Sequence, residues 1–185
     1  MELDTEGAGN ISSLEKEGDI FAITASFGQG ITVTPLQLLQ AYAAIASGGV
    51  LMKPRLVSEI RYADGYVERP KREELRRVLS PKTARLLGAM LVSVVEQGHG
   101  RRAGVDGYYI AGKTGTAQVA KDGVYSTTET IGSFAGFGPV ENPRFVMVTR
   151  LDNPKGVTFA ESTAAPLFGE LADFLLEYLH VAPSR

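Results

Sequence analysis

The feature that most constrains the fold is a change of hydrophobic pattern near Tyr108, where helical spacing gives way to extended segments. Beyond this point the sequence favours three strands, at 108–119, 130–138 and 144–151. Turn residues separate the strands, near Asp122-Gly123 and across 139–143. Connections this short join neighbouring strands that run in opposite directions, so the second half of the chain predicts an antiparallel meander.

Three helices are predicted around this sheet. The first two, at 34–48 and 80–98, begin with a hydroxyl N-cap followed by proline and end at glycine. The apolar stripe of the second helix, expected to face the core, is Leu86, Leu87, Met90, Leu91, Val94 and Val95. The apolar side of the last helix is Leu167, Phe168, Leu171, Phe174, Leu175, Tyr178 and Leu179. Helices packed on an antiparallel sheet define an α+β fold.

A small hairpin is predicted between the first two helices. Segments 56–60 and 66–67 favour strands, and they flank the turn signal Asp64-Gly65. The stretch 69–77 that follows is the densest charged part of the chain, and it mixes both signs. It therefore predicts a solvated linker rather than a binding patch.

The composition fits one domain or a large part of one. The chain has 185 residues, and 44% of them are hydrophobic, which is enough to build a sizeable core. Its 19 basic and 21 acidic residues are dispersed, so no basic face for nucleic acid is expected. Cysteine is absent, and His, Asp and Glu do not cluster at ligand spacing, so we expect neither a metal nor another cofactor. No apolar run approaches the ~20 residues of a membrane span, so no membrane segment is expected within this chain.

Residues 112–117, Gly-Lys-Thr-Gly-Thr-Ala, point to an anionic ligand, because they place a lysine and two hydroxyls beside a glycine. With Gly107 they also fit the phosphate-loop pattern G-x-x-x-x-G-K-[ST]. That loop needs a helix that starts at the lysine, whereas the residues around Lys113 favour a strand. A strand places Lys113 and Gly115 on one face, and Thr114 and Thr116 on the other. The segment therefore predicts a carboxylate or phosphate ligand on a strand, with nucleotide binding as the less favoured alternative.

No serine nucleophile is evident. Ser13-Leu-Glu-Lys16 matches S-x-x-K, but a lysine that acts as a base needs burial or a neighbouring charge to lower its pKa, and its neighbours are polar. A solvated loop is expected there instead. Of the two histidines, His99 lies in a glycine-flanked loop where it could line a site, and His180 follows the last helix.

Several stretches together resemble the C-terminal part of the transpeptidase domain of class B penicillin-binding proteins, enzymes that cross-link bacterial peptidoglycan. They are Ala25-Ser-Phe-Gly-Gln-Gly30 leading into Thr34-Pro-Leu-Gln37, then Ala46-Ser-Gly-Gly-Val-Leu-Met-Lys-Pro54, Val94-Val-Glu-Gln-Gly-His-Gly-Arg-Arg-Ala103, Ala111-Gly-Lys-Thr-Gly-Thr-Ala-Gln118 and Ser133-Phe-Ala-Gly-Phe-Gly138. The resemblance implies the antiparallel sheet with packed helices that these enzymes share with serine β-lactamases. One departure is His99, where the family usually has threonine.

The resemblance also implies roles for the K-T-G segment. Lys113 would be a catalytic residue that supports proton transfer through the serine of an S-x-N motif. Thr114, Gly115 and Thr116 would bind substrate, with the hydroxyls on the terminal carboxylate of a peptidoglycan stem peptide or of a β-lactam. The backbone N–H of Thr116 would form half of the oxyanion hole, which makes Thr116 the second catalytic residue.

The family uses the motifs S-x-x-K, S-x-N and K-T-G in that order, and only the last is in its expected place here. We therefore expect residues 1–185 to be the C-terminal part of a transpeptidase domain that lacks the first two motifs and is inactive alone. Its parent would be anchored by an N-terminal segment at the extracytoplasmic face of the bacterial membrane, among other cell-wall synthesis or division proteins. Two alternatives stay open: a serine β-lactamase or β-lactam sensor, and a non-catalytic module that binds peptides or partner proteins.

Overall fold

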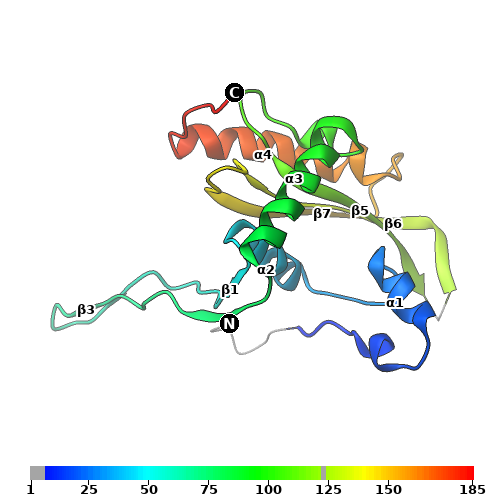
Figure 1. Ribbon diagram of the computed structural model, residues 1–185, viewed down its shortest axis with the longest axis horizontal. Coiled ribbons are helices and arrows are strands. Elements are labelled where there is room, and N and C mark those ends of the chain that lie inside the picture. The colour runs from blue at the N-terminus through cyan, green and yellow to red at the C-terminus, as the bar shows by residue number, and fades with distance from the viewer. Residues whose placement is uncertain (1–6, 122–123) are drawn as a thin grey trace.

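The computed structural model describes residues 7–121 and 124–185 and confirms the α+β prediction. At its centre is a three-stranded antiparallel sheet in the order β5 (Ala111–Lys121), β6 (Val124–Gly138) and β7 (Phe145–Asp152). Strand β5 therefore forms one edge of the sheet. Figure 1 shows helix α4 on one face of the sheet and helix α2 on the other.

The predicted meander is confirmed, with shifted bounds. Strand β5 starts at Ala111 rather than at Tyr108, because the backbone N–H of Tyr108 donates to the carbonyl of Val105 at 3.2 Å and closes a turn. The Tyr108 side chain is buried and donates its hydroxyl to the carbonyl of Val181 at 2.6 Å. Strand β6 begins earlier than predicted and pairs with β5 over most of its length. The predicted turn at Asp122-Gly123 lies outside the described residues.

The helix starts follow their local signals. Helix α2 (Pro35–Ala46) begins with a capping box, in which Thr34 Oγ1 accepts from the Gln37 N–H at 3.1 Å and the Gln37 side chain accepts from the Thr34 N–H at 2.9 Å. Helix α3 (Pro81–Gln97) begins after Ser80, whose hydroxyl accepts from the N–H of Thr83. These caps satisfy backbone donors that the first helical turn leaves open.

The face that α4 (Ala164–Tyr178) buries matches the prediction at Phe168 but differs from it at most other positions. Its buried residues are Ala164, Ala165, Phe168, Gly169, Ala172 and Leu176, whereas the larger Leu167, Leu171, Phe174 and Tyr178 are exposed. The small residues let the helix lie close to the sheet, where the rings of Phe168 and Phe134 have centroids 4.6 Å apart. The hydrophobic pattern favoured the side of the helix with the larger apolar residues, because the sequence carries no signal for the close approach of a helix to a sheet.

The stripe predicted on α3 is also partly wrong. Val95 is buried, but Leu86 and Met90 are more than half exposed. The residues of α3 that face the sheet include Gly88, where an added Cβ would lie 3.3 Å from the Val140 side chain. Here too a small residue sets the contact.

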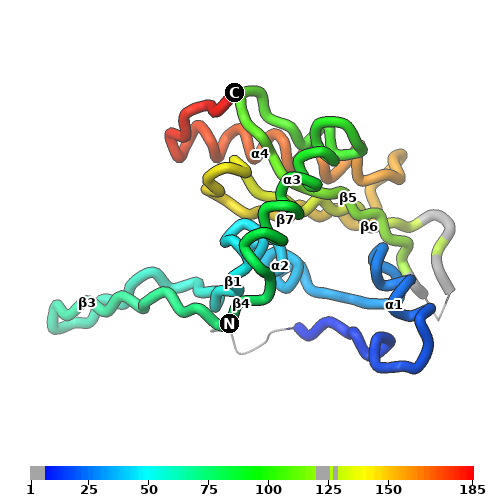
Figure 2. The backbone as a smooth tube through the Cα atoms, viewed as in Figure 1, coloured from blue at the N-terminus to red at the C-terminus, as the bar shows by residue number. Residues whose placement is uncertain are grey.

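An arm at residues 53–73 projects away from the sheet (Figures 1 and 2). At its base β1 (Val50–Met52) pairs with β4 (Glu74–Arg77), and farther out β2 (Ile60–Arg61) pairs with β3 (Val67–Glu68). The predicted hairpin is confirmed. The predicted linker at 69–77 is wrong in its last four residues, which form strand β4. Local sequence could not indicate this strand, because its partner β1 lies more than twenty residues earlier in the chain.

The remaining elements are short. Before α2 lie the 3₁₀ helix η1 (Ser12–Glu15) and helix α1 (Asp19–Ser26), of which the sequence analysis predicted neither. Two further 3₁₀ turns are η2 (Arg101–Ala103), which packs against α3 and α4, and η3 (Ala160–Ser162), which packs against β5 and β6.

Candidate active site

The K-T-G segment lies on the edge strand β5, and the predicted division of its faces is confirmed. An added Cβ at Gly115 would come within 2.7 Å of Ser133 Oγ on the neighbouring strand. Thr116 points to the opposite face, where its Oγ1 accepts a hydrogen bond from the Ala160 N–H at 3.1 Å. Because Lys113 is in a strand rather than at a helix N-terminus, the phosphate-loop alternative is wrong.

The hydrogen-bond pattern of β6 fixes which backbone groups of β5 face outward. In an antiparallel strand the N–H and C=O of one residue point to the same side, and successive residues alternate. The carbonyls of Thr130 and Gly138 accept from residues at the two ends of β7. Even-numbered residues of β6 therefore face β7, and odd-numbered residues such as Ser133 face β5.

The pairing register between β5 and β6 shows which residues of the edge strand β5 point their backbone groups inward and which outward. Lys113 and Gly115 pair with Ala135 and Ser133, which face β5, so both direct their backbone groups inward. Thr114 and Thr116 must then direct their N–H and C=O groups away from the sheet. The Lys113 amine agrees with this geometry, because it donates to the carbonyl of Thr114 at 3.1 Å from the open side. The edge thus offers alternating main-chain donors and acceptors beside a lysine.

The 3₁₀ turn η3 orients the Thr116 hydroxyl. Ala160, whose N–H bonds Thr116, is fully buried, and an added Cβ on Gly132 would meet the Thr163 hydroxyl at 2.8 Å, so the turn lies tightly on the sheet. Since the hydroxyl oxygen accepts from Ala160, its hydrogen remains available to another acceptor. Thr116 is itself exposed, so that acceptor can come from solvent or from a ligand.

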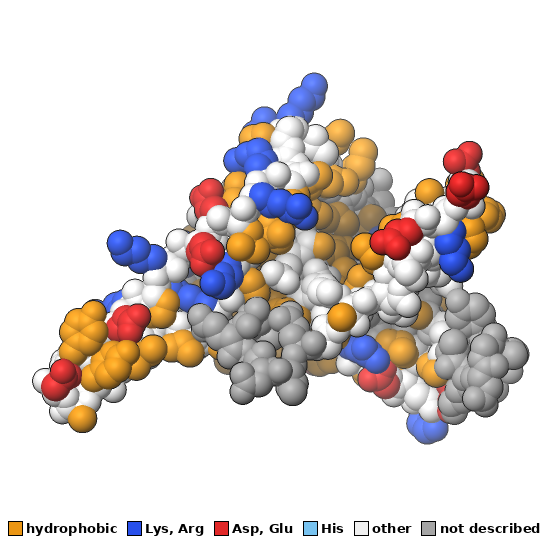
Figure 3. All heavy atoms as spheres, turned by 90° about the horizontal axis from the view of Figure 1, so that it is seen from below, with side chains coloured by type: hydrophobic (Ala, Val, Ile, Leu, Met, Phe, Trp, Pro, Cys, Tyr) orange, Lys and Arg blue, Asp and Glu red, His pale blue; other side chains and the backbone are white. Residues whose placement is uncertain are grey.

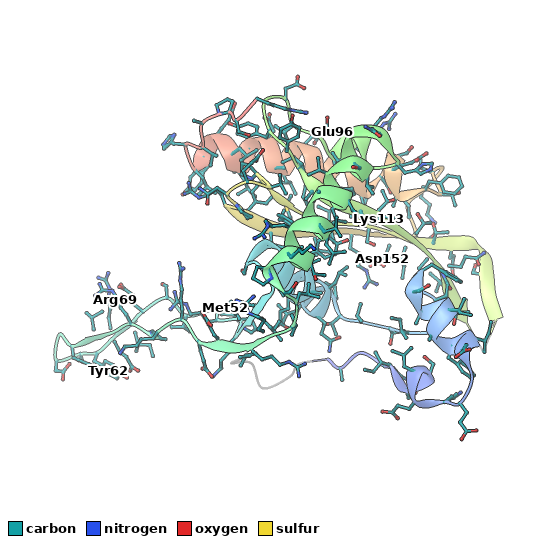
Figure 4. The ribbon with its side chains drawn as sticks, in the orientation of Figure 1. Met52, Tyr62, Arg69, Glu96, Lys113 and Asp152 are labelled. Atoms are coloured by element: carbon teal, nitrogen blue, oxygen red, sulfur yellow. The ribbon has the colours of Figure 1, made fainter. Side chains whose placement is uncertain are left out.

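The face that carries Lys113 is polar. The Ser133 hydroxyl donates to the carbonyl of Gly115 at 3.3 Å, and beyond it Arg150 pairs with Asp152 at 2.8 Å. Figure 4 labels Lys113 on β5 and Asp152 at the end of β7. The Lys113 side chain is exposed, which leaves its amine free to contact a group placed against the edge.

Comparison with known proteins decides the family. Residues 1–173 match the family described as the penicillin binding protein transpeptidase domain. The chain belongs to this family.

Curated relatives in the family cover most of the chain. Stage V sporulation protein D of Bacillus subtilis is 37% identical over 190 residues, which is 100% of this chain and 29% of that protein. Penicillin-binding protein PbpB of Mycolicibacterium smegmatis is 41% identical over 166 residues, 81% of this chain and 25% of that protein. The chain thus spans less than a third of the length of these two relatives.

Solved structures of the family share the fold. The crystal structure of penicillin binding protein 3 from Mycobacterium tuberculosis, in its apo form, matches with a TM-score of 0.82 and 36% identity, over 92% of this chain and 41% of that one. Structures of the same protein complexed with aztreonam and with ampicillin match with the same TM-score.

The S-x-x-K match at Ser13 does not have the geometry that penicillin-binding proteins need. The Ser13 hydroxyl donates to the carbonyl of Gly30 at 2.7 Å, and Lys16 Nζ lies 5.4 Å from the centroid of the Phe21 ring. The two side chains therefore have separate partners. The segment is the 3₁₀ turn η1 rather than an irregular loop, and most of it is exposed, as predicted.

His99, the departure from the family pattern, lies close to the site without belonging to it. Its Nδ1 pairs with Glu161 Oε2 at 2.5 Å. Glu161 follows Ala160, the residue that bonds Thr116, so His99 contacts η3 through the neighbour of that residue. The ring itself is 84% exposed, and no contact with the K-T-G segment is present among the described residues.

Two residues of this candidate site escaped the sequence analysis. Ala160 acts through its backbone N–H, for which a sequence has no signal, and Ser133 was noticed only as part of a family stretch. Within residues 7–121 and 124–185, no group of His, Asp and Glu could hold a metal ion. In the same ranges no helix is long and apolar enough to cross a membrane.

Proposed function

We propose that the protein acts as a serine D,D-transpeptidase that cross-links peptidoglycan stem peptides, and that this chain supplies the wall of the site that binds the substrate carboxylate. The observation that carries the proposal is the open edge of β5, where Lys113 and the outward backbone groups of Thr114 and Thr116 lie together. Relatives named peptidoglycan D,D-transpeptidase support the reaction. The aztreonam and ampicillin complexes of the mycobacterial protein support β-lactams as ligands.

Each residue then has a defined part in the reaction. The hydroxyls of Thr114 and Thr116 donate to the carboxylate, and Gly115 lets the ligand backbone approach the strand. The outward N–H of Thr116 stabilises the oxyanion that forms when the carbonyl is attacked. Lys113 supports proton transfer to the leaving group. The nucleophilic serine and the S-x-N serine come from a part of the protein outside these 185 residues.

The proposal places the enzyme at the extracytoplasmic face of the bacterial membrane, because its substrate is the cell wall. Other cell-wall synthesis or division proteins would be its partners. Among the alternatives, the relatives favour a transpeptidase over a β-lactamase or sensor, since several of them carry transpeptidase or penicillin-binding names. A non-catalytic module would require that the complete protein lack an acylated serine.

The test is the rate of acylation by a fluorescent penicillin in the complete gene product. Thr116→Ala removes one hydrogen bond to a charged group, which is worth ~1.5–3 kcal/mol, so acylation efficiency should fall roughly 10- to 150-fold. Thr116→Ser is the matched control because it keeps the hydroxyl, and it should retain most of the rate.

An esterified penicillin separates recognition from general damage to the site. Because the ester has no carboxylate, Thr116→Ala should reduce its acylation much less than that of the free acid. Equal losses with acid and ester would mean that Thr116 does not bind the carboxylate. Absence of any acylated serine in the complete protein would overturn the proposed reaction itself.

A further inference from the structure

The base of the arm encloses a cavity that the transpeptidase site does not use. It has a volume of about 710 Å³, within the range of small-molecule sites. The lining residues are Ser47, Met52, Lys53, Arg55, Pro70, Lys71, Arg72 and Glu73. They come from the two strands of the arm where it leaves the body, and from the end of α2.

The cavity is strongly basic for a chain of this composition. Its lining holds four cations and one carboxylate, a local charge of +3, although the whole chain has a net charge of -2. The carboxylate of Glu73 is bonded to Lys53 at 3.0 Å. In the part of the chain that the structure describes, Arg55, Lys71 and Arg72 form no ion pair. Figure 3 shows basic side chains gathered where the arm joins the body.

Backbone contacts hold the two sides of the arm together at the cavity and anchor Arg55. The N–H of Lys53 donates to the carbonyl of Glu73 at 2.9 Å, which ties the two sides of the arm together next to the β1–β4 pairing. The guanidinium of Arg55 donates to the carbonyl of Pro70 across the arm. Arg55 is thus anchored through one of its five N–H groups, which leaves the others for a ligand.

We infer that this cavity binds a phosphate-bearing anion. Like charges that outnumber their counter-charges are stabilised by a ligand of opposite sign, and guanidinium groups match phosphate oxygens in bidentate geometry. The ligand is either a soluble phosphate compound or the headgroup of an anionic phospholipid, which present the same chemistry to the cavity. Met52 and Pro70 supply an apolar wall that suits the organic part of a phosphate ester.

Calorimetric titration of the 185-residue chain with inorganic pyrophosphate at low ionic strength tests the site. We expect saturable binding with one pyrophosphate per chain, and weaker binding as salt is added, because screening acts on exposed charges. Arg72→Ala and Arg55→Ala should each weaken binding about tenfold, since each removes charge-assisted hydrogen bonds. Cosedimentation with phosphatidylglycerol vesicles, against phosphatidylcholine vesicles, tests the lipid source.

The matched control is Lys82→Ala, which removes an exposed cation at the start of α3 that does not line the cavity. Binding of pyrophosphate indicates a soluble ligand, and binding of phosphatidylglycerol alone indicates a headgroup. The inference is overturned if neither binds, or if Lys82→Ala weakens binding as much as Arg72→Ala. Circular dichroism of each variant verifies that the exposed substitutions leave the fold intact.

Discussion

Two glycines on β5 lie three residues apart, and their environments predict losses of stability of very different size on substitution by alanine. A Cβ at the buried Gly112 would overlap the ring of Phe134 and lie 2.9 Å from the carbonyl oxygen of Ala135. Phe134 cannot yield, because it is fully buried against Phe168 at a centroid distance of 4.6 Å. A Cβ at Gly115 would meet only the end of a side chain, the hydroxyl of Ser133 at 2.7 Å.

These contacts set the expected change in the free energy of unfolding for each variant. Overpacking a core costs about 1–3 kcal/mol, and the rigid backing of Phe134 puts Gly112→Ala in the upper half of that range. Gly115→Ala loses at most the 3.3 Å bond from Ser133, about 0.5–1.5 kcal/mol, and regains roughly 0.5–1 kcal/mol by replacing a strand glycine. Its net effect on the free energy of unfolding should therefore be below about 1 kcal/mol.

Urea denaturation followed by circular dichroism measures both variants, since the chain has no tryptophan to serve as a fluorescence probe. We expect a lower midpoint for Gly112→Ala, and a melting temperature lower by about 4–12 °C for a domain of this size. The midpoint of Gly115→Ala should stay near that of the wild type. If the two variants lose equal stability, the contact between β5 and the Phe134 ring does not determine how much strand β5 contributes to the free energy of unfolding.

Two further outcomes are expected of the same chain. Burial raises the pKa of Tyr42 to about 12, so the folded state favours the neutral phenol. The neutral phenol contributes up to about 2–3 kcal/mol to the free energy of unfolding, and this contribution is complete below pH 10 and lost as the pH rises to 12. Over that range the free energy of unfolding should therefore fall less steeply for Tyr42→Phe than for the wild type. Identical slopes would contradict the assignment. Fluorescent penicillin should leave the 185-residue chain unlabelled, because Ser13 and Lys16 have separate partners; a penicilloyl adduct on Ser13 found by mass spectrometry would reverse that interpretation.

Local signals predicted the parts of the fold that local interactions determine. The capping residues Thr34 and Ser80 located the starts of two helices, because a cap bonds only to the next turn of the same helix. The meander followed from short turns between extended segments. The exposed side of α4 could not be predicted in this way, since large apolar residues such as Phe174 remain in solvent while Ala172 lies against the sheet.

The same limit applies to the site. The position of Lys113 on a strand, and the division of its neighbours between two faces, followed from residue preferences alone. The bond between Ala160 and Thr116 joins residues 44 positions apart, and its donor is a backbone group. The alternation of outward groups along the edge also required the register with β6, which depends on the position of the whole sheet.

The open edge of β5 has a consequence for how this site can evolve. Main-chain donors do not depend on side-chain identity, so no ordinary substitution at Thr114 or Thr116 can delete them. Proline can, because it lacks an N–H, and at these two positions it would spare the ladder to β6. The main-chain contacts of a ligand on this edge are therefore easier to lose by displacing the strand than by changing its side chains. Positions behind it, such as Phe134 and Phe168, become the sensitive ones.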